Sequence, residues 1–186
     1  MTLVTRFHPL LVTLHWLLAI LLVIMLGAGF FLLASMPNSD PHKVGVLLVH
    51  MSLGMVIFIL TAIRLMVRLR AARPADATTG PLPERTAQAV HYGFYAVVFL
   101  MVATGYATAI LAGLNRIVFQ GSGEPLPPDF SSYPGFVAHG YLALLLAGLI
   151  ALHVAAVLYH QLIAKDPLLR RMWYGRRLAK AAARAD

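Results

Sequence analysis

The sequence predicts an all-α integral membrane protein, a four-helix bundle with its N- and C-termini on the cytoplasmic side. Of the 186 residues, 60% are hydrophobic and only 12% are charged, whereas a soluble domain carries about 25% charged residues. Four apolar runs are each long enough to cross a hydrocarbon core, which takes about 20 helical residues. Histidines recur inside these runs, where ionisable side chains are rare and indicate function. These three observations together predict the fold class.

The composition also excludes several kinds of site. The chain has no cysteine, which excludes Fe–S clusters, disulfides, cysteine zinc sites and covalent haem attachment through C-x-x-C-H. The net charge of +8 does not indicate nucleic-acid binding, because the basic residues lie at the edges of the apolar runs and in the tail. That pattern is typical of membrane topology and of contact with anionic headgroups. One membrane domain, residues 1–186, accounts for the length.

The first half of the chain is predicted to form two spans. The first, residues 10–34, is too long for the hydrophobic region of a signal peptide. The turn SMPNSDPHK, with two prolines, leads into the second span, residues 43–69. Basic side chains mark the far end of the second span: Arg64, Arg68, Arg70 and Arg73. A polar loop, residues 71–83, follows.

The second half of the chain is predicted to form two more spans, joined by a longer loop. The third span covers residues 85–114 and the fourth covers residues 136–164. The loop between them is rich in Gly and Pro and long enough to attract functional interest. A basic tail, residues 165–186, ends the chain. Four spans put both termini on one side, which collects thirteen of the fifteen Lys and Arg residues and is therefore predicted to face the cytoplasm.

Two histidines of the fourth span organise the predicted site. His139 and His153 are fourteen residues apart, which is roughly 21 Å along a helix and brings both to within about 40° of one azimuth. They therefore look out from one face at two depths. Counted from the interfaces, His15 on the first span matches the depth of His153, and His50 on the second span matches that of His139. The predicted pairs are one in the inner half of the membrane and one in the outer half.

Each pair is predicted to bind one haem iron from its two faces. Imidazole suits haem iron, and a haem with two histidine ligands keeps both axial positions filled, which favours electron transfer over oxygen binding. The alternative is a transporter or channel in which the histidines are buried and hydrogen-bonded to the backbone. An absorption spectrum distinguishes the two, because only haem gives a Soret band.

Two further histidines lie between the inner pair and the cytoplasmic surface. They are His91 on the third span and His160 on the fourth, which shares a face with His153. A quinone head group needs hydrogen bonds and protons at such a depth, so both are candidates for a quinone site, with Arg6 as a weaker member. The alternative is that both are solvated side chains at the interface.

Several motifs coincide with these positions. They are LHW at residues 14–16, VHMSLG at 49–54, AVHYGFY around His91, and KDPLLRRM after the last span. Together with the histidine spacing on the four spans, they make nearly the whole chain similar to the bacterial cytochrome b561 family of four-helix di-haem membrane cytochromes.

The resemblance implies two non-covalent haem b groups, with ligands on the first, second and fourth spans, in a bacterial inner membrane. It also implies electron exchange between an outer donor and a quinone near the cytoplasm. Superoxide and ubiquinone are the leading donor and acceptor, because superoxide oxidation with quinone reduction is one known activity of the family. The alternative is a cytochrome b subunit of a larger dehydrogenase or hydrogenase, which would co-purify with that enzyme.

Superoxide is an anion, so its approach from outside depends on local positive charge. The outer side carries two cations, Lys43 and Arg116, against three acids, Asp40, Glu124 and Asp129, a formal charge of −1. Net charge therefore does not attract the anion, and we expect one of the two cations to act locally. Arg116, directly after the third span, is the better placed. The alternative is that it anchors the helix end among the lipid headgroups.

Overall fold

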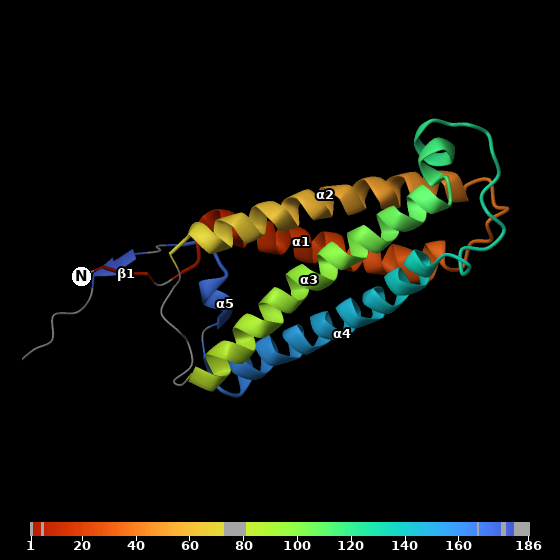
Figure 1. Cartoon of the computed structure of the whole chain (residues 1–186). Helices are drawn as coiled ribbons and strands as arrows, with labels where there is room; N and C mark the ends of the chain where they lie inside the picture. Colours follow the sequence, from red (N-terminus) through yellow and green to blue (C-terminus); the bar gives the residue numbers. More distant parts are fainter. Residues whose placement is uncertain (1, 5, 73–80, 167, 176–177, 181–186) are drawn as a thin grey trace, which may run out of the picture.

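Four long helices run side by side as a bundle in the computed structural model (Figure 1). The structure describes residues 2–4, 6–72, 81–166, 168–175 and 178–180. The four helices are α1 (Pro9–Gly27), α2 (Lys43–Arg70), α3 (Pro81–Leu111) and α4 (Pro134–Leu162). Each lies in a segment that is long and apolar enough to cross a membrane, which confirms the predicted all-α membrane bundle. The predicted loop 71–83 and tail 165–186 lie partly outside the described residues.

The helices begin and end where local chemistry favours it. Pro9 occupies the first turn of α1, where its missing N–H costs nothing, and the His8 ring accepts a hydrogen bond from the Leu10 N–H at 3.2 Å. Pro134 begins α4 in the same way. The last turn of α2 carries Arg68 and Arg70, whose charges complement the negative end of the helix dipole. The apolar runs are thus closed by polar groups at the interfaces.

Two π-helical segments extend the helices at the end of the bundle opposite the described termini, which is the predicted outer end. The segment η1 (Ala28–Leu33) continues α1, and η2 (Asn115–Phe119) follows α3 and packs against α2. Ile117 and Val118 of η2 are buried in a cluster with side chains of the following loop. The loop after α3 therefore packs over this end of the bundle, because its apolar side chains Leu126 and Phe130 are buried in the same cluster.

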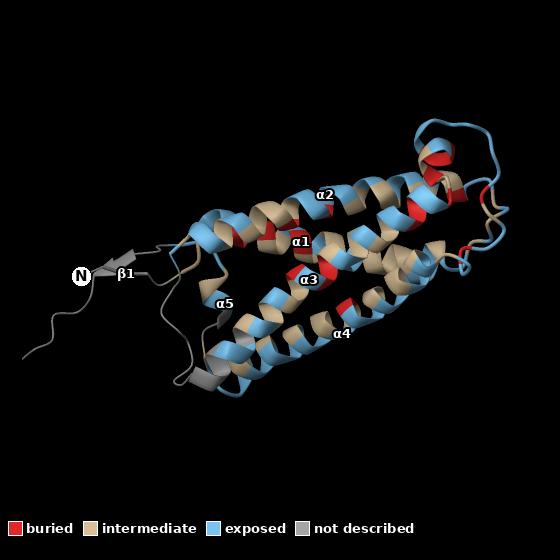
Figure 2. Ribbon diagram, viewed as in Figure 1, coloured by how far each residue is buried: buried red, intermediate tan, exposed pale blue. Residues whose placement is uncertain are grey.

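The helices pack chiefly in two pairs, α1 with α2 and α3 with α4. Gly135 allows the second pair to meet closely at the outer end, because a Cβ there would lie 2.8 Å from the Thr104 carbonyl oxygen. Between 6% and 28% of the most apolar stretch of each span is buried within the chain, and the four helices are coloured mostly as exposed or intermediate in Figure 2. Such an apolar exterior is what a lipid bilayer accommodates.

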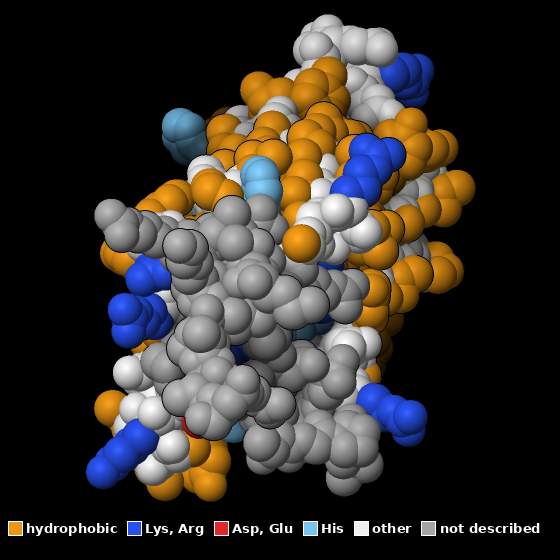
Figure 3. All heavy atoms as spheres, turned by 90° about the vertical axis from the view of Figure 1, so that its left-hand side faces the viewer, with side chains coloured by type: hydrophobic (Ala, Val, Ile, Leu, Met, Phe, Trp, Pro, Cys, Tyr) orange, Lys and Arg blue, Asp and Glu red, His pale blue; other side chains and the backbone are white. Residues whose placement is uncertain are grey.

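The C-terminal segment returns to the start of α1 through α5 (Leu168–Arg171). The strand β2 (Leu178–Lys180) pairs antiparallel with β1 (Thr2–Val4), and the Trp16 indole N–H donates to the Met172 carbonyl at 3.0 Å. Both ends of the described chain therefore lie at one end of the bundle (Figure 1). Figure 3 views this end and shows Lys and Arg side chains spread around it.

Candidate functional site

Four histidines form two pairs across the bundle. The ring centroids of His15 on α1 and His153 on α4 are 6.3 Å apart, and those of His50 on α2 and His139 on α4 are 6.2 Å apart. Two imidazoles that bind one metal ion from opposite sides, each through a nitrogen about 2 Å away, have centroids roughly 6 Å apart. Each pair therefore has the separation that axial ligation of one iron requires.

The paired histidines join helices that are not closely packed. Within the described residues, α4 packs mainly against α3, whereas its histidine partners belong to α1 and α2. A flat group held between the rings of a pair would therefore not have to separate two tightly packed helices. This arrangement fits a porphyrin at both levels.

The hydrogen bond of His139 prepares its ring to bind a metal. Its Nδ1 lies 2.9 Å from the Met101 carbonyl oxygen. Because a carbonyl only accepts, the proton is on Nδ1, and Nε2 keeps the lone pair that a metal needs. Gly105 makes room for this ring, since a Cβ there would lie 3.2 Å from Nδ1. At the other ring of the pair, the buried His50 Nδ1 has no hydrogen-bond partner among the described residues.

An apolar layer separates the two levels. Leu146 lies midway along α4 between His139 and His153 and is fully buried. Buried side chains from the three other long helices surround it in one cluster: Leu18, Ile57, Val97 and Val98. The two histidine pairs are therefore separate sites with a dry layer between them.

A third histidine lies at the inner level. The His91 ring centroid is 6.0 Å from that of His153, so His91 lies beside the inner pair and not nearer the surface, where the sequence placed it. His91 belongs to α3, which packs closely against α4, so a group between these two rings would have to separate the helices. His15 is therefore the better partner for His153.

The other residues of the predicted quinone site have separate partners. The Nδ1 of His160 lies 2.9 Å from Asp166 Oδ2, and both side chains are about one-third exposed. The Arg6 guanidinium donates to the backbone carbonyls of Trp173 and Tyr174, at 3.1 and 2.5 Å. Sequence reasoning missed Asp166, although it stands in the KDP motif directly after the last span.

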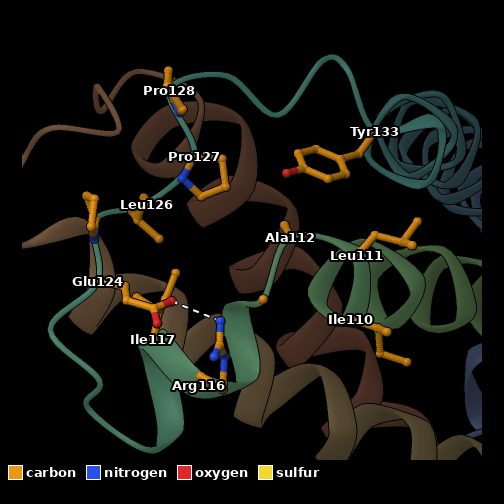
Figure 4. A pocket seen from close by; sticks show the side chains of 12 residues that line it. Ile110, Leu111, Ala112, Arg116, Ile117, Glu124, Leu126, Pro127, Pro128 and Tyr133 are labelled. Atoms are coloured by element: carbon orange, nitrogen blue, oxygen red, sulfur yellow. Dashed lines mark hydrogen bonds and ion pairs between the residues drawn. The ribbon is translucent and has the colours of Figure 1, made fainter.

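The two outer cations differ sharply in setting. Lys43 is buried, and its ammonium group donates to the Met36 carbonyl. Arg116 is exposed and forms an ion pair with Glu124 at 3.1 Å. Both members of this pair line an open cavity of about 650 Å³ at the outer end, with Tyr133 on the opposite wall (Figure 4). Arg116 is therefore the more accessible of these two cations, with part of its charge offset by Glu124.

Comparison with known proteins gives two findings. The family model described as prokaryotic cytochrome b561 matches residues 6–175, a range that includes all four long helices and both histidine pairs. The protein named cytochrome b561 homolog 2 from Escherichia coli (strain K12) is 28% identical over 163 residues, which cover 85% of this chain and 86% of that protein.

Proposed function

The chain belongs to the prokaryotic cytochrome b561 family, and we propose that it carries electrons across the bacterial inner membrane from superoxide outside to ubiquinone near the cytoplasm. The family makes it a membrane electron-transfer protein that binds haem b. The observation that carries the proposal is the presence of two histidine pairs, with ring separations of 6.3 and 6.2 Å, at two depths. Two haems at these two depths would give electrons a path through the membrane, whereas a single haem would span only part of its thickness.

In this proposal, His15 and His153 hold the inner haem b, and His50 and His139 hold the outer one. When bound, haem b supplies an iron that stores and releases one electron. With two histidines holding each iron, no position would be left open for oxygen, which would favour electron transfer over oxygen binding. The Met101 carbonyl fixes the tautomer of His139, and the layer around Leu146 excludes water between the levels.

The outer half-reaction places the donor near Arg116. Two superoxide anions each release one electron and leave as O2, and one quinone takes up these two electrons and two protons to form quinol. Arg116 attracts the anion at the surface, and Lys43 adds positive charge from a buried position. Glu124 weakens the attraction, because its carboxylate is paired with Arg116.

The inner half-reaction uses the cytoplasmic end of the bundle. His160 is half-buried there with Asp166 as its hydrogen-bond partner, which suits proton delivery to a quinone oxygen. His91 lies beside the inner pair, where its ring contacts that of His153. Arg6 contributes by holding the C-terminal segment against α1. The basic side chains at this end support its cytoplasmic orientation (Figure 3).

A haem count with ligand variants tests the proposal. The pyridine haemochrome assay on purified protein is expected to give two haems per chain. His15→Ala is expected to remove the inner haem and His139→Ala the outer one, whereas His42→Ala, in a loop, retains both. A count of one in fully loaded protein, or loss of the same single haem in both ligand variants, contradicts the pairing.

The donor is tested by stopped-flow measurement of haem reduction. Superoxide is expected to reduce the haems of the wild-type protein, and added ubiquinone is expected to reoxidise them. Failure of superoxide to reduce either haem would refute it as the donor. Co-purification of a dehydrogenase or hydrogenase would then favour the partner-subunit alternative.

A further inference from the structure

Two arginines of α2 lie inside the bundle with unsatisfied donors. Arg64 and Arg68 are one helical turn apart, and both side chains are half-buried within a membrane-spanning segment. The Nε atom of each is buried and has no hydrogen-bond partner among the described residues. Buried donors are almost always paired in proteins, and a cation in a membrane span is costly. The Nε groups of both arginines therefore call for an acceptor that the described residues do not supply.

A tyrosine of α3 holds each arginine in place. The Arg64 guanidinium carbon lies 5.4 Å from the centroid of the Tyr95 ring, and its Nη1 donates to the Tyr95 hydroxyl. The Arg68 guanidinium lies 5.5 Å from the centroid of the Tyr92 ring. Such stacking fixes the plane of a guanidinium and leaves its edge for another partner. The two arginines are thus oriented before any ligand binds.

This arginine pair lies next to the inner histidine pair. Arg64 contacts Tyr95, which lies one turn along α3 from His91, and the His91 ring centroid is 6.0 Å from that of His153. Arg68 follows one turn nearer the basic end of α2. An anion bound by both arginines would therefore extend from the inner histidines toward the cytoplasmic surface.

We propose that Arg64 and Arg68, oriented by Tyr95 and Tyr92, bind the carboxylate side groups of the inner haem. This inference rests on the proposed inner haem. Haem b carries two carboxylates on one edge. Two guanidinium groups one turn apart can each donate two parallel hydrogen bonds to a carboxylate. A phosphate of an anionic lipid has similar chemistry, so the experiment has to distinguish these two sources.

The site has a consequence for the redox potential of the inner haem. The ferric centre carries one more positive charge than the ferrous centre, so nearby cations favour the ferrous form. Removal of Arg64 also leaves a carboxylate without its neutralising partner, which favours the ferric form further. Both effects lower the midpoint potential of the inner haem. The outer haem lies roughly 21 Å farther along α4, so the change of charge acts on it less strongly.

Potentiometric titration of the intact di-haem protein tests this site. Arg64→Gln is expected to shift the ferric-to-ferrous equilibrium of the inner haem at least tenfold toward ferric, which is about 59 mV for one electron. Arg68→Gln is expected to shift it in the same direction. Arg70→Gln, an exposed arginine of the same helix end, serves as the matched control and leaves both potentials unchanged.

Infrared redox difference spectra identify the anion. Protein carrying haem with 13C-labelled carboxylates is expected to show labelled bands that move in Arg64→Gln and not in Arg70→Gln. Unmoved bands, combined with a potential that changes when lipid is removed, would assign the site to a lipid phosphate and overturn the proposal. An unchanged inner potential in Arg64→Gln, or an equal shift of both haems, would also overturn it.

If Arg64→Gln does not accumulate, Tyr95→Phe gives the second test. It keeps the ring and removes the hydroxyl that Arg64 contacts. A smaller shift of the inner haem alone supports the proposal, and no shift counts against it. The haem count of the wild-type protein separates the two levels of inference, because a protein with two haems and an insensitive potential refutes only the arginine site.

Discussion

Gly105→Ala is the sharpest test of how the structure supports the outer histidine pair. Gly105 on α3 faces the His139 ring, and a Cβ at this position would lie 3.2 Å from Nδ1 and 3.3 Å from Cε1. Both distances are shorter than an ordinary van der Waals contact. The ring therefore has to move by a few tenths of an ångström, away from the Met101 carbonyl or out of line with His50.

The size of the effect follows from two opposing terms. Alanine favours the helix over glycine by about 1 kcal/mol, and the Met101 hydrogen bond contributes about 0.5–1.5 kcal/mol, so the free energy of unfolding should change little. Haem binding is more sensitive. Loss of the partner that orients a metal-binding histidine typically weakens the metal site by about 10- to 100-fold. We therefore expect the outer haem to bind at least about tenfold more weakly.

The assay is transfer of haem from purified protein to excess apomyoglobin, followed by redox difference spectra of what remains. Gly105→Ala should lose its outer haem faster than the wild type and retain its inner haem. Gly45→Ala in α2 is the matched control, because a Cβ there meets nothing within 4 Å and brings only the gain in helix propensity. Equal behaviour of the two variants at both haems would refute the role of this close contact.

Two further predictions address the two ends of the electron path. One unit charge about 10 Å from the path of an anion changes its energy by about 0.4 kcal/mol in water, or about twofold in rate. At low salt, Glu124→Gln should therefore double the rate of haem reduction by superoxide, and Arg116→Gln should halve it. Asp129→Asn is the control, because it changes an acid in the same loop and leaves the ion pair of Arg116 with Glu124 in place. Both effects on the rate should disappear at high salt. If neither substitution changes the rate at low salt, electrostatic steering of the anion is contradicted. At the other end, Asp166→Asn should slow quinone reduction severalfold with both haem spectra unchanged, because His160 loses the carboxylate that orients it. Unaltered quinone kinetics would remove this pair from the site.

The arrangement along each helix is largely determined by the sequence. The length of the apolar runs predicted four membrane-spanning helices, and the described residues contain four helices that are long and apolar enough to cross a membrane. The spacing of His139 and His153 placed them on one face of α4 at two depths, because the turn and rise of a helix depend only on local backbone geometry. Counting from the charged ends matched each of them to a histidine on another helix, and the structure brings the same residues together.

The arrangement between helices was decided only by the tertiary structure. Sequence spacing does not give the rotation of α3 about its axis, which turns His91 toward His153. Sequence spacing also does not show which part of the bundle a loop or tail packs against. The partners of Arg116 and Arg6 were therefore not predicted. These contacts join residues from separate segments, and their geometry results from the packing of the whole bundle. Helix periodicity therefore gives the depth of each histidine, whereas interhelical packing determines which side chains lie beside it.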